Sequence, residues 1–163
     1  MKRREFKLKP GQVDFTHARW APVINSIVKF KDRFDKLTAG KILIVKRSKE
    51  MRLYPGKWNS IGGFLDDHKN LEEKVKEELN EELGIGAGDI ISIKLGEIFD
   101  LDDPNYKKTW VIHPVLVEVK SDKVRLDWEA EEYKWVTLPE IKNFDTVFGF
   151  DKVVDKLFKG NKK

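Results

Sequence analysis

The sequence predicts an α+β fold in which a mixed β-sheet is covered by helices. Three stretches rich in β-branched and other apolar residues, at 20–30, 41–46 and 109–119, are typical of buried strands. Residues 70–83 instead show the four-residue spacing of apolar side chains that is typical of an amphipathic helix. The chain has 163 residues, 40% of them hydrophobic, which suffices for one core. We therefore expect a single domain over 1–163.

The N-terminal third carries the first strands and a long loop. Residues 1–19 are basic and polar, so we expect an irregular, basic N-terminal arm before the first strand. The segment 47–63 contains Pro55-Gly56 and Gly62-Gly63. Such pairs are typical of turns, and they predict a long loop that ends in a tight turn.

The expected helix at 70–83 has signals at both ends. Its apolar stripe consists of Leu71, Val75, Leu79 and Leu83. Asn70 is suited to be the N-cap, and Glu73, three places on, completes a capping box. Gly84 is suited to end the helix.

The remaining third alternates strands with helices. The expected elements are strands at 90–99, 109–119 and 133–136 and helices at 138–142 and 149–158. The segment between the first two strands is rich in Asp, Pro and Asn, and we expect an exposed turn at 100–103, with Asp100, Asp102 and Asp103 as a less favoured metal site. Residues 159–163 form a Lys-rich tail.

Composition excludes several classes of protein. There is no cysteine, which rules out disulfides, thiolate zinc sites and cysteine nucleophiles. No apolar run approaches the roughly 20 residues that cross a bilayer, and the N-terminus lacks the apolar stretch of a signal peptide. We therefore expect a cytoplasmic protein that is not bound to a membrane.

Carboxylates gather on one flank of the predicted helix. Glu78, Glu81 and Glu82 stand at i, i+3 and i+4, at the margin of the apolar stripe. Repulsion between like charges at this spacing would become attraction around a hard cation, and oxygen ligands favour Mg²⁺ or Mn²⁺. The alternative is an ordinary exposed helix in which Lys74 pairs with Glu78.

With the glycine-rich segment before it, this helix resembles the Nudix hydrolase family. The family's box reads Gly, five residues, Glu, seven residues, Arg-Glu, an aliphatic residue, any residue, Glu-Glu, any residue, Gly and an aliphatic residue. The matching residues here are Gly63, Glu78, Leu79, Glu81, Glu82, Gly84 and Ile85. The resemblance implies an α/β/α sandwich with a central mixed β-sheet, in which the box forms a loop–helix–loop.

Two positions depart from the family's box. Lys69 stands where the family has its first glutamate, and Glu77 stands where it has the arginine that braces the catalytic acids. An acid at 77 adds repulsion where support is expected, although Lys74, Lys76 or Arg52 could compensate.

The resemblance also implies an activity, the hydrolysis of a diphosphate linkage in a nucleotide or nucleoside diphosphate derivative. Glu78, Glu81 and Glu82 would hold Mg²⁺ or Mn²⁺, and Glu78 or a later acid would be the general base. That later acid is Glu129 by its spacing to a tryptophan-containing strand, with Glu131 and Glu132 as competitors.

Substrate contacts are expected from the loop before the helix and from aromatic residues. The candidates for phosphate binding are Arg47, Arg52, Lys57, Gly62 and Gly63. The candidates for stacking on a base are Trp20, Trp58, Trp110 and Trp128. The expected partner is a small nucleotide-type molecule; nucleic acid is not favoured, and a homodimer is possible.

Two other functions remain open. A Nudix-fold module that binds nucleotides or RNA with little turnover would fit the departures at Lys69 and Glu77. An isomerase of isoprenoid diphosphates would share the fold, but in the family that chemistry normally uses a cysteine, which this chain lacks.

Overall fold

The computed structural model describes residues 7–31 and 40–159. Within them, eight strands form one sheet, and two α-helices and two short 3₁₀ helices flank it. The strands are β1 (Trp20–Phe30), β2 (Ile42–Arg47), β3 (Trp58–Asn59), β4 (Ile61–Phe64), β5 (Ile90–Leu95), β6 (Phe99–Asp103), β7 (Lys108–Val119) and β8 (Ala130–Val136). The helices are α1 (Leu71–Leu83), η1 (Ala87–Asp89), η2 (Leu138–Asn143) and α2 (Phe150–Phe158).

The long strands β1 and β7 form the centre of the sheet and run parallel. All other pairings of strands in the sheet are antiparallel, so the sheet is mixed as expected. The first half of β1 pairs with β4, and its end pairs with β2. This division of β1 brings the glycines of β4 to the middle of the molecule.

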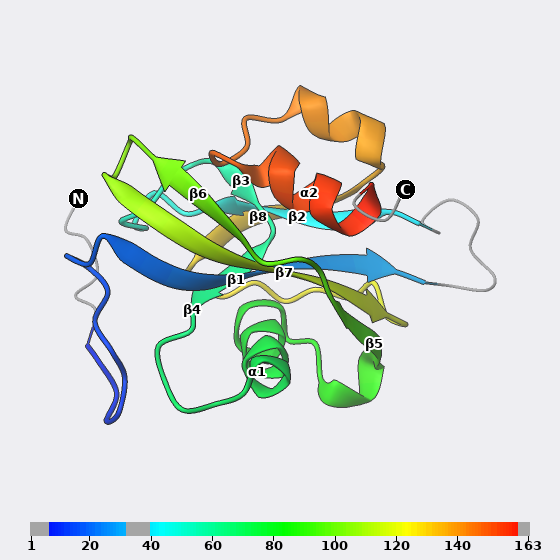
Figure 1. The fold of residues 1–163 in the computed structure, drawn as a ribbon. Helices are drawn as coiled ribbons and strands as arrows, with labels where there is room; N and C mark the ends of the chain where they lie inside the picture. Colours follow the sequence, from blue (N-terminus) through cyan, green and yellow to red (C-terminus); the bar gives the residue numbers. More distant parts are fainter. Residues whose placement is uncertain (1–6, 32–39, 160–163) are drawn as a thin grey trace.

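Helices cover both faces of the sheet, which confirms the predicted α/β/α arrangement (Figure 1). One apolar cluster fills the space under α1 and includes Val75, Leu79 and Leu83. A second cluster lies on the α2 side, around Phe150 and Val153. No helix in the described part of the chain is long and apolar enough to cross a membrane.

The structure corrects four of the predicted elements. The segment 47–63 is not all loop, because it contains β3 and the start of β4, whose glycine backbone pairs with β1. The strand expected at 90–99 is two strands, β5 and β6, which pair in turn with β7. The strand expected from 133 begins at Ala130, and the helix expected at 138–142 is the 3₁₀ helix η2.

The turn expected at 100–103 is also wrong, since these residues belong to β6. Leu101 and Asp103 are buried, and Asp102 between them is exposed. The carboxylate of Asp103 accepts hydrogen bonds from the Tyr54 hydroxyl and, at 3.0 Å, from Trp110 Nε1. The carboxylate of Asp103, which the sequence analysis had considered as a metal ligand, is therefore already hydrogen-bonded to two side chains.

The two charged ends fall partly outside the described residues. Of the arm expected at 1–19, residues 7–19 are described; they are irregular, as expected, but they pack against the sheet and the segment before α1. Lys2, Arg3, Arg4 and residues 160–163 lie outside the described part.

Candidate active site

The helix α1 is held in place by the cap and stripe that its sequence predicts. Asn70 Oδ1 accepts a hydrogen bond from the Glu73 amide at 2.9 Å, and Glu73 accepts one from the Asn70 amide at 3.3 Å. Gly84 ends the helix with φ 68°. Because the apolar stripe is buried against the sheet, the acidic flank beside it is turned toward β4.

Gly63 and Glu78 lie in direct contact. A Cβ placed on Gly63 would come within 2.7 Å of Glu78 Oε1. The Glu78 carboxylate thus occupies the space that any other residue at 63 would fill with its side chain. This contact explains why a glycine precedes the acidic helix at this spacing.

Three acids face one another at the inner end of the site. Glu82 lies beside Glu78 and Glu129, and its Oε2 is buried without a hydrogen-bond partner in the described part of the chain. Burial and these neighbours raise the pKa of Glu82 well above its ordinary value. Burial also raises the pKa of Glu78 to about 7, despite the nearby Lys74 ammonium. Such a group of acids is a ready site for a cation.

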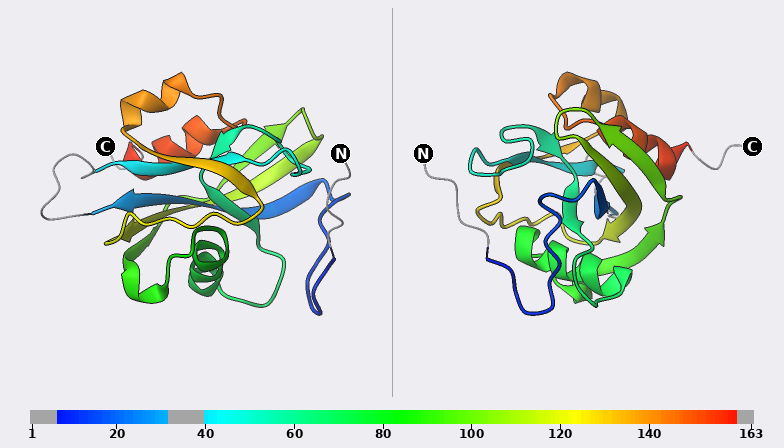
Figure 2. Two further views of the ribbon diagram at one scale, coloured as in Figure 1. Left: turned by 180° about the vertical axis from the view of Figure 1, so that it is seen from behind. Right: turned by 60° about the vertical axis from the view of Figure 1, so that its left-hand side comes forward.

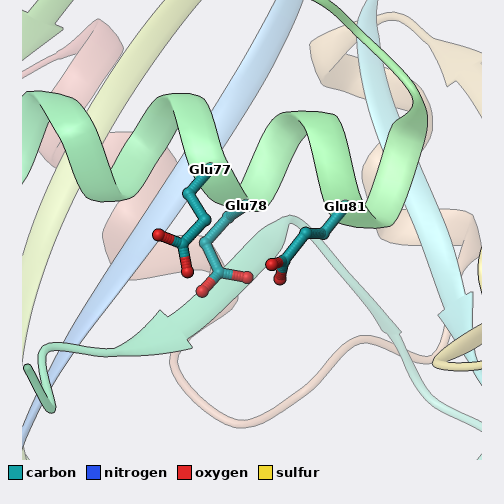
Figure 3. A group of neighbouring side chains, drawn as sticks. All are labelled: Glu77, Glu78 and Glu81. Carbon is teal, nitrogen blue, oxygen red and sulfur yellow. The ribbon is translucent and has the colours of Figure 1, made fainter. Parts of the chain in front are cut away.

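A second face of the cluster is closer to solvent. Carboxylate oxygens of Glu77, Glu78 and Glu81 lie within 4.8 Å of one another, and their side chains leave α1 on the same side (Figure 3). Glu78 therefore belongs to both groups, between Glu82, whose Oε2 is buried, and the exposed Glu81.

The cluster opens into a cavity of about 410 Å³. Glu82, Glu129, Gly62 and Gly63 line it on the acidic side. The rest of the wall combines aliphatic side chains with cationic and aromatic ones, which include Arg47, Arg52, Tyr54, Phe64, Trp110 and Trp128. A concave, partly apolar space with a few convergent charged groups is the usual form of a ligand site.

Comparison with known proteins decides the family. The model of the NUDIX domain matches residues 33–157, about three quarters of the chain. The chain belongs to the Nudix family. The enzyme class that the sequence predicted, a Nudix hydrolase acting on diphosphate bonds, is confirmed.

Individual proteins agree with the family model. The nucleoside triphosphatase NudI of Klebsiella pneumoniae (strain 342) is 25% identical over 115 aligned positions, and the match covers 65% of this chain and 79% of that protein. The NUDIX domain of Shewanella oneidensis NrtR, solved with ADP ribose, superposes with a TM-score of 0.70 at 15% identity, covering 88% of this chain and 89% of that one. For a MutT protein of Methanosarcina mazei Go1 the TM-score is 0.64 at 24% identity, over 90% and 99%. These structural likenesses confirm the fold.

The two departures from the Nudix box form an ion pair with each other. Lys69 Nζ lies 2.9 Å from Glu77 Oε2. Hydrogen bonds to Glu77 and Asp67 raise the pKa of Lys69. The positive and negative partners have therefore exchanged places relative to the family's box.

Lys74 adds a second positive charge, as the sequence had allowed. Its side chain is buried, and Nζ lies 3.1 Å from Asp66 and 3.0 Å from Asp67. The same ammonium is 3.8 Å from Glu77 and 3.9 Å from Glu78. Although burial opposes its charge, hydrogen bonds to the two aspartates raise the pKa of Lys74. In this Nudix hydrolase Lys74 therefore braces the acids from inside the helix–loop junction.

The predicted substrate residues divide into two groups. Arg47, Arg52, Gly62 and Gly63 line the cavity, as do Trp110 and Trp128. Lys57 does not, because its ammonium pairs with Asp145 at 2.9 Å. Trp58 packs against Phe144, and Trp20 lies outside the cavity lining.

The three late acids are likewise separated. Glu129 lines the cavity and faces Glu82. Glu131 pairs with Lys46 at 3.4 Å, and Glu132 lies 4.0 Å from Lys134, both on exposed positions of β8.

Sequence reasoning missed two residues of the site. Glu77 was noted only as a departure from the box, yet it joins the carboxylate cluster. Asn59 lines the cavity, and its buried Oδ1 has no hydrogen-bond partner among the described residues. The two polar residues Asn59 and Ser60, between Trp58 and Ile61, were the available signal.

Proposed function

We propose that this Nudix hydrolase cleaves a phosphoanhydride bond of a nucleoside triphosphate or a nucleoside diphosphate derivative, with Mg²⁺ or Mn²⁺ as cofactor. One observation carries the proposal: the unpartnered, buried Oε2 of Glu82, between two other acids, at the inner end of a cavity with cationic and aromatic walls.

The donor set fits a hard divalent cation. Glu77, Glu78, Glu81 and Glu82 offer only carboxylate oxygens, which Mg²⁺ and Mn²⁺ prefer. Buried acids that face one another are costly unless they are protonated or paired with positive charge. Glu78, Glu81 and Glu82 would hold the cation, while Glu77 stays paired with Lys69. A cation bound there would screen phosphate oxygens and lower the pKa of a bound water.

The remaining residues orient the substrate and move the proton. Glu129 is the general base in our proposal, since it lines the cavity next to Glu82 and is not one of the α1 carboxylates. Arg47 and Arg52 bind phosphate oxygens, because guanidinium groups match them well. Trp128 or Trp110 stacks on the nucleobase of the substrate. Asn59 Oδ1 accepts a hydrogen bond from an N–H group of the substrate.

A nucleoside triphosphate is the preferred substrate class. It agrees with the activity by which the Klebsiella pneumoniae relative is named, that of a nucleoside triphosphatase. The cavity of about 410 Å³ also lies within the roughly 300–1,000 Å³ of usual small-molecule sites.

The test is a phosphate- and pyrophosphate-release screen over nucleoside triphosphates, nucleoside diphosphate sugars and dinucleotides, with Mg²⁺, with Mn²⁺ and with EDTA. We expect turnover that requires the cation. Glu82→Gln removes one ligand charge and should lower kcat and weaken Mn²⁺ binding measured by calorimetry. Glu129→Gln should lower kcat about 10²–10⁴-fold, the usual contribution of a general base, while leaving Mn²⁺ affinity nearly unchanged.

Glu132→Gln is the matched control, because it makes the same chemical change on an exposed position of β8. It should behave as wild type. Binding of nucleotides without turnover on any compound would contradict the proposal and favour a binding module. Equal losses for Glu129→Gln and Glu132→Gln would contradict the assignment of the base.

A further inference from the structure

The segment from Lys7 to Arg19 lies outside the region that matches the NUDIX domain, which begins at residue 33. In the structure this segment runs along the end of the molecule, beside the loop between β4 and α1 (Figures 1 and 2). A segment that the family model does not include therefore borders the catalytic box.

Its anchor is Asp66, at the start of that loop. Gln12 Nε2 donates to Asp66 Oδ2 at 2.6 Å, and the Val13 amide donates to the Asp66 carbonyl at 2.6 Å. Asp66 is only 6% exposed and also binds Lys74. Because Lys74 lies near Glu77 and Glu78, the anchor of the segment is joined to the acid cluster by one buried network.

Two further contacts fix the rest of the segment. Lys108 Nζ donates to the carbonyls of Phe15 and Ala18 at 2.6 and 2.7 Å. The Phe15 ring stacks on Phe64 with centroids 5.9 Å apart, and Phe64 lines the cavity. The segment is thus attached at both ends of its course past the site.

This attachment places two lysines at the site. Lys7 lines the cavity, and Lys9 Nζ lies 3.8 Å from Glu81 Oε1. A turn holds Lys9 in position: its amide donates to Gln12 Oε1 at 2.8 Å, and its carbonyl accepts from the Gln12 amide at 3.0 Å. Gly11, with φ 80°, permits the turn. The residue that anchors the segment, Gln12, therefore also sets the place of Lys9.

We propose that Lys7 and Lys9 are phosphate-binding residues, supplied to the active site by the N-terminal segment. The proposal rests on the proposed function, because the ligand is the diphosphate portion of that substrate. Lys9 reaches the outermost carboxylate of the cluster, on the solvent side from which an anionic substrate would approach. When Glu81 binds a cation, the ammonium of Lys9 loses its partner and is close enough to serve a phosphate oxygen instead.

The test compares binding of two probes to the full chain by calorimetry: Mn²⁺ alone, and imidodiphosphate in the presence of saturating Mn²⁺. In Lys7→Gln/Lys9→Gln we expect the Kd for imidodiphosphate to rise at least about threefold to fivefold, the effect of losing an exposed ion pair. The Kd for Mn²⁺ should stay constant or fall slightly, because the cation no longer competes with a lysine for Glu81. A higher Kd for imidodiphosphate without a higher Kd for Mn²⁺ distinguishes a phosphate contact from general damage to the site.

Lys142→Gln/Lys152→Gln is the matched control, with the same change of charge on η2 and α2, across the sheet from α1 (Figure 1). It should leave both constants unchanged. Gln12→Glu, which sets two carboxylates against each other at Asp66, should release the segment. It should reproduce the weaker imidodiphosphate binding, together with faster hydrogen exchange at the Val13 amide.

An unchanged Kd for imidodiphosphate in the double variant, or a parallel loss of Mn²⁺ and imidodiphosphate binding, overturns the proposal. So does a wild-type protein that binds Mn²⁺ but no imidodiphosphate. Binding of imidodiphosphate is measured without hydrolysis, so the test gives a result even if the nucleotide screen shows no turnover. Where turnover is present, KM should rise in the double variant with little change in kcat.

Discussion

Lys69 and Glu77 depart from the family's pattern, yet the two positions still pair a positive with a negative charge. An acid at 77 alone would add charge to a cluster that already contains Glu78 and Glu81. The ammonium of Lys69, 2.9 Å away, offsets that charge. A basic residue at 77 would be tied to an acid at 69 in the same way, so the pair can be reversed while the residues around it stay in place.

We predict that reversing the pair restores part of what each single change disturbs. Lys69→Glu places a third carboxylate beside Asp67 and Glu77, and Glu77→Arg sets a cation against Lys69 and Lys74, so each should lower the Tm. Lys69→Glu/Glu77→Arg should recover part of the lost Tm, with kcat within about a few-fold of wild type, because residues 69 and 77 again carry opposite charges. The measurement is a double-mutant cycle of thermal unfolding and turnover.

The pair Lys76 and Glu72, 3.0 Å apart on the exposed face of α1, serves as the comparison. Reversing it should change neither turnover nor Mn²⁺ binding. If the Lys69–Glu77 double variant shows the sum of its two single effects, without recovery, the two residues act independently.

The strand β4 and the helix α1 are coupled, because Gly63 of β4 lies against the carboxylate of Glu78 in α1. Gly63→Ala would place a methyl group 2.7 Å from Glu78 Oε1. Since this oxygen ends a flexible side chain, we expect Glu78 to move while the strand stays folded. Activity should fall by about 10²-fold, as expected for a displacement of about 1 Å at a catalytic group, with only a small change in Tm.

Gly86→Ala is the matched control for this change. A Cβ at Gly86 meets no atom within 4 Å, and its φ of −80° suits alanine. Wild-type activity is expected there. A fall in Tm for Gly63→Ala as large as the fall in activity would show that the glycine serves the strand and not the carboxylate.

Local sequence signals correctly predicted elements such as α1. They missed the strands that form only by pairing with segments far away in the sequence. The capping box of Asn70 and Glu73 and the Gly84 stop lie within one stretch of chain, and they placed α1 correctly. The strands β3 and β4 exist because β2 and β1 pair with them, which no local pattern in a glycine-rich segment reveals. The box spacing identified Glu78, Glu81 and Glu82, but the approach of Gln12 to Asp66 spans 54 positions and had no signal in the sequence.

Over the whole molecule, charge is distributed unevenly. The formal net charge is +4, while residues 72–82 alone hold six glutamates and two lysines, a net of −4. The structure turns part of this acidic segment inward, toward Arg47 and the cavity. A basic molecule with one buried acidic site attracts anions at long range and retains cations at short range.

That buried acidity makes the stability of the metal-free protein depend on pH. The pKa of Glu78 is about 7 in the folded chain against an ordinary 4.5, and burial raises the pKa of Glu82 in the same direction. Between these values the folded state binds more protons than the unfolded state, so stability is greatest at low pH within this window and is lost as pH rises. Each such carboxyl contributes a slope of up to about 1.4 kcal/mol per pH unit. Acids whose pKa is lowered, such as Asp67 at about 2, titrate below this window.

We therefore predict that the free energy of unfolding, measured with urea in EDTA, falls between about pH 5 and pH 7, and that millimolar Mg²⁺ or Mn²⁺ reverses this trend. A cation binds the ionised carboxylates of the folded state, so its stabilisation grows as these acids lose their protons. Glu78→Gln and Glu82→Gln should each flatten the fall in EDTA and weaken the effect of the cation, whereas Glu132→Gln should change neither. A pH slope that survives both substitutions would place its origin in other groups, and a cation effect equal at pH 5 and pH 8 would mean that the ion binds elsewhere. The two curves, with and without the cation, thus test on one protein whether the acids that destabilise the empty site are the acids that hold the metal.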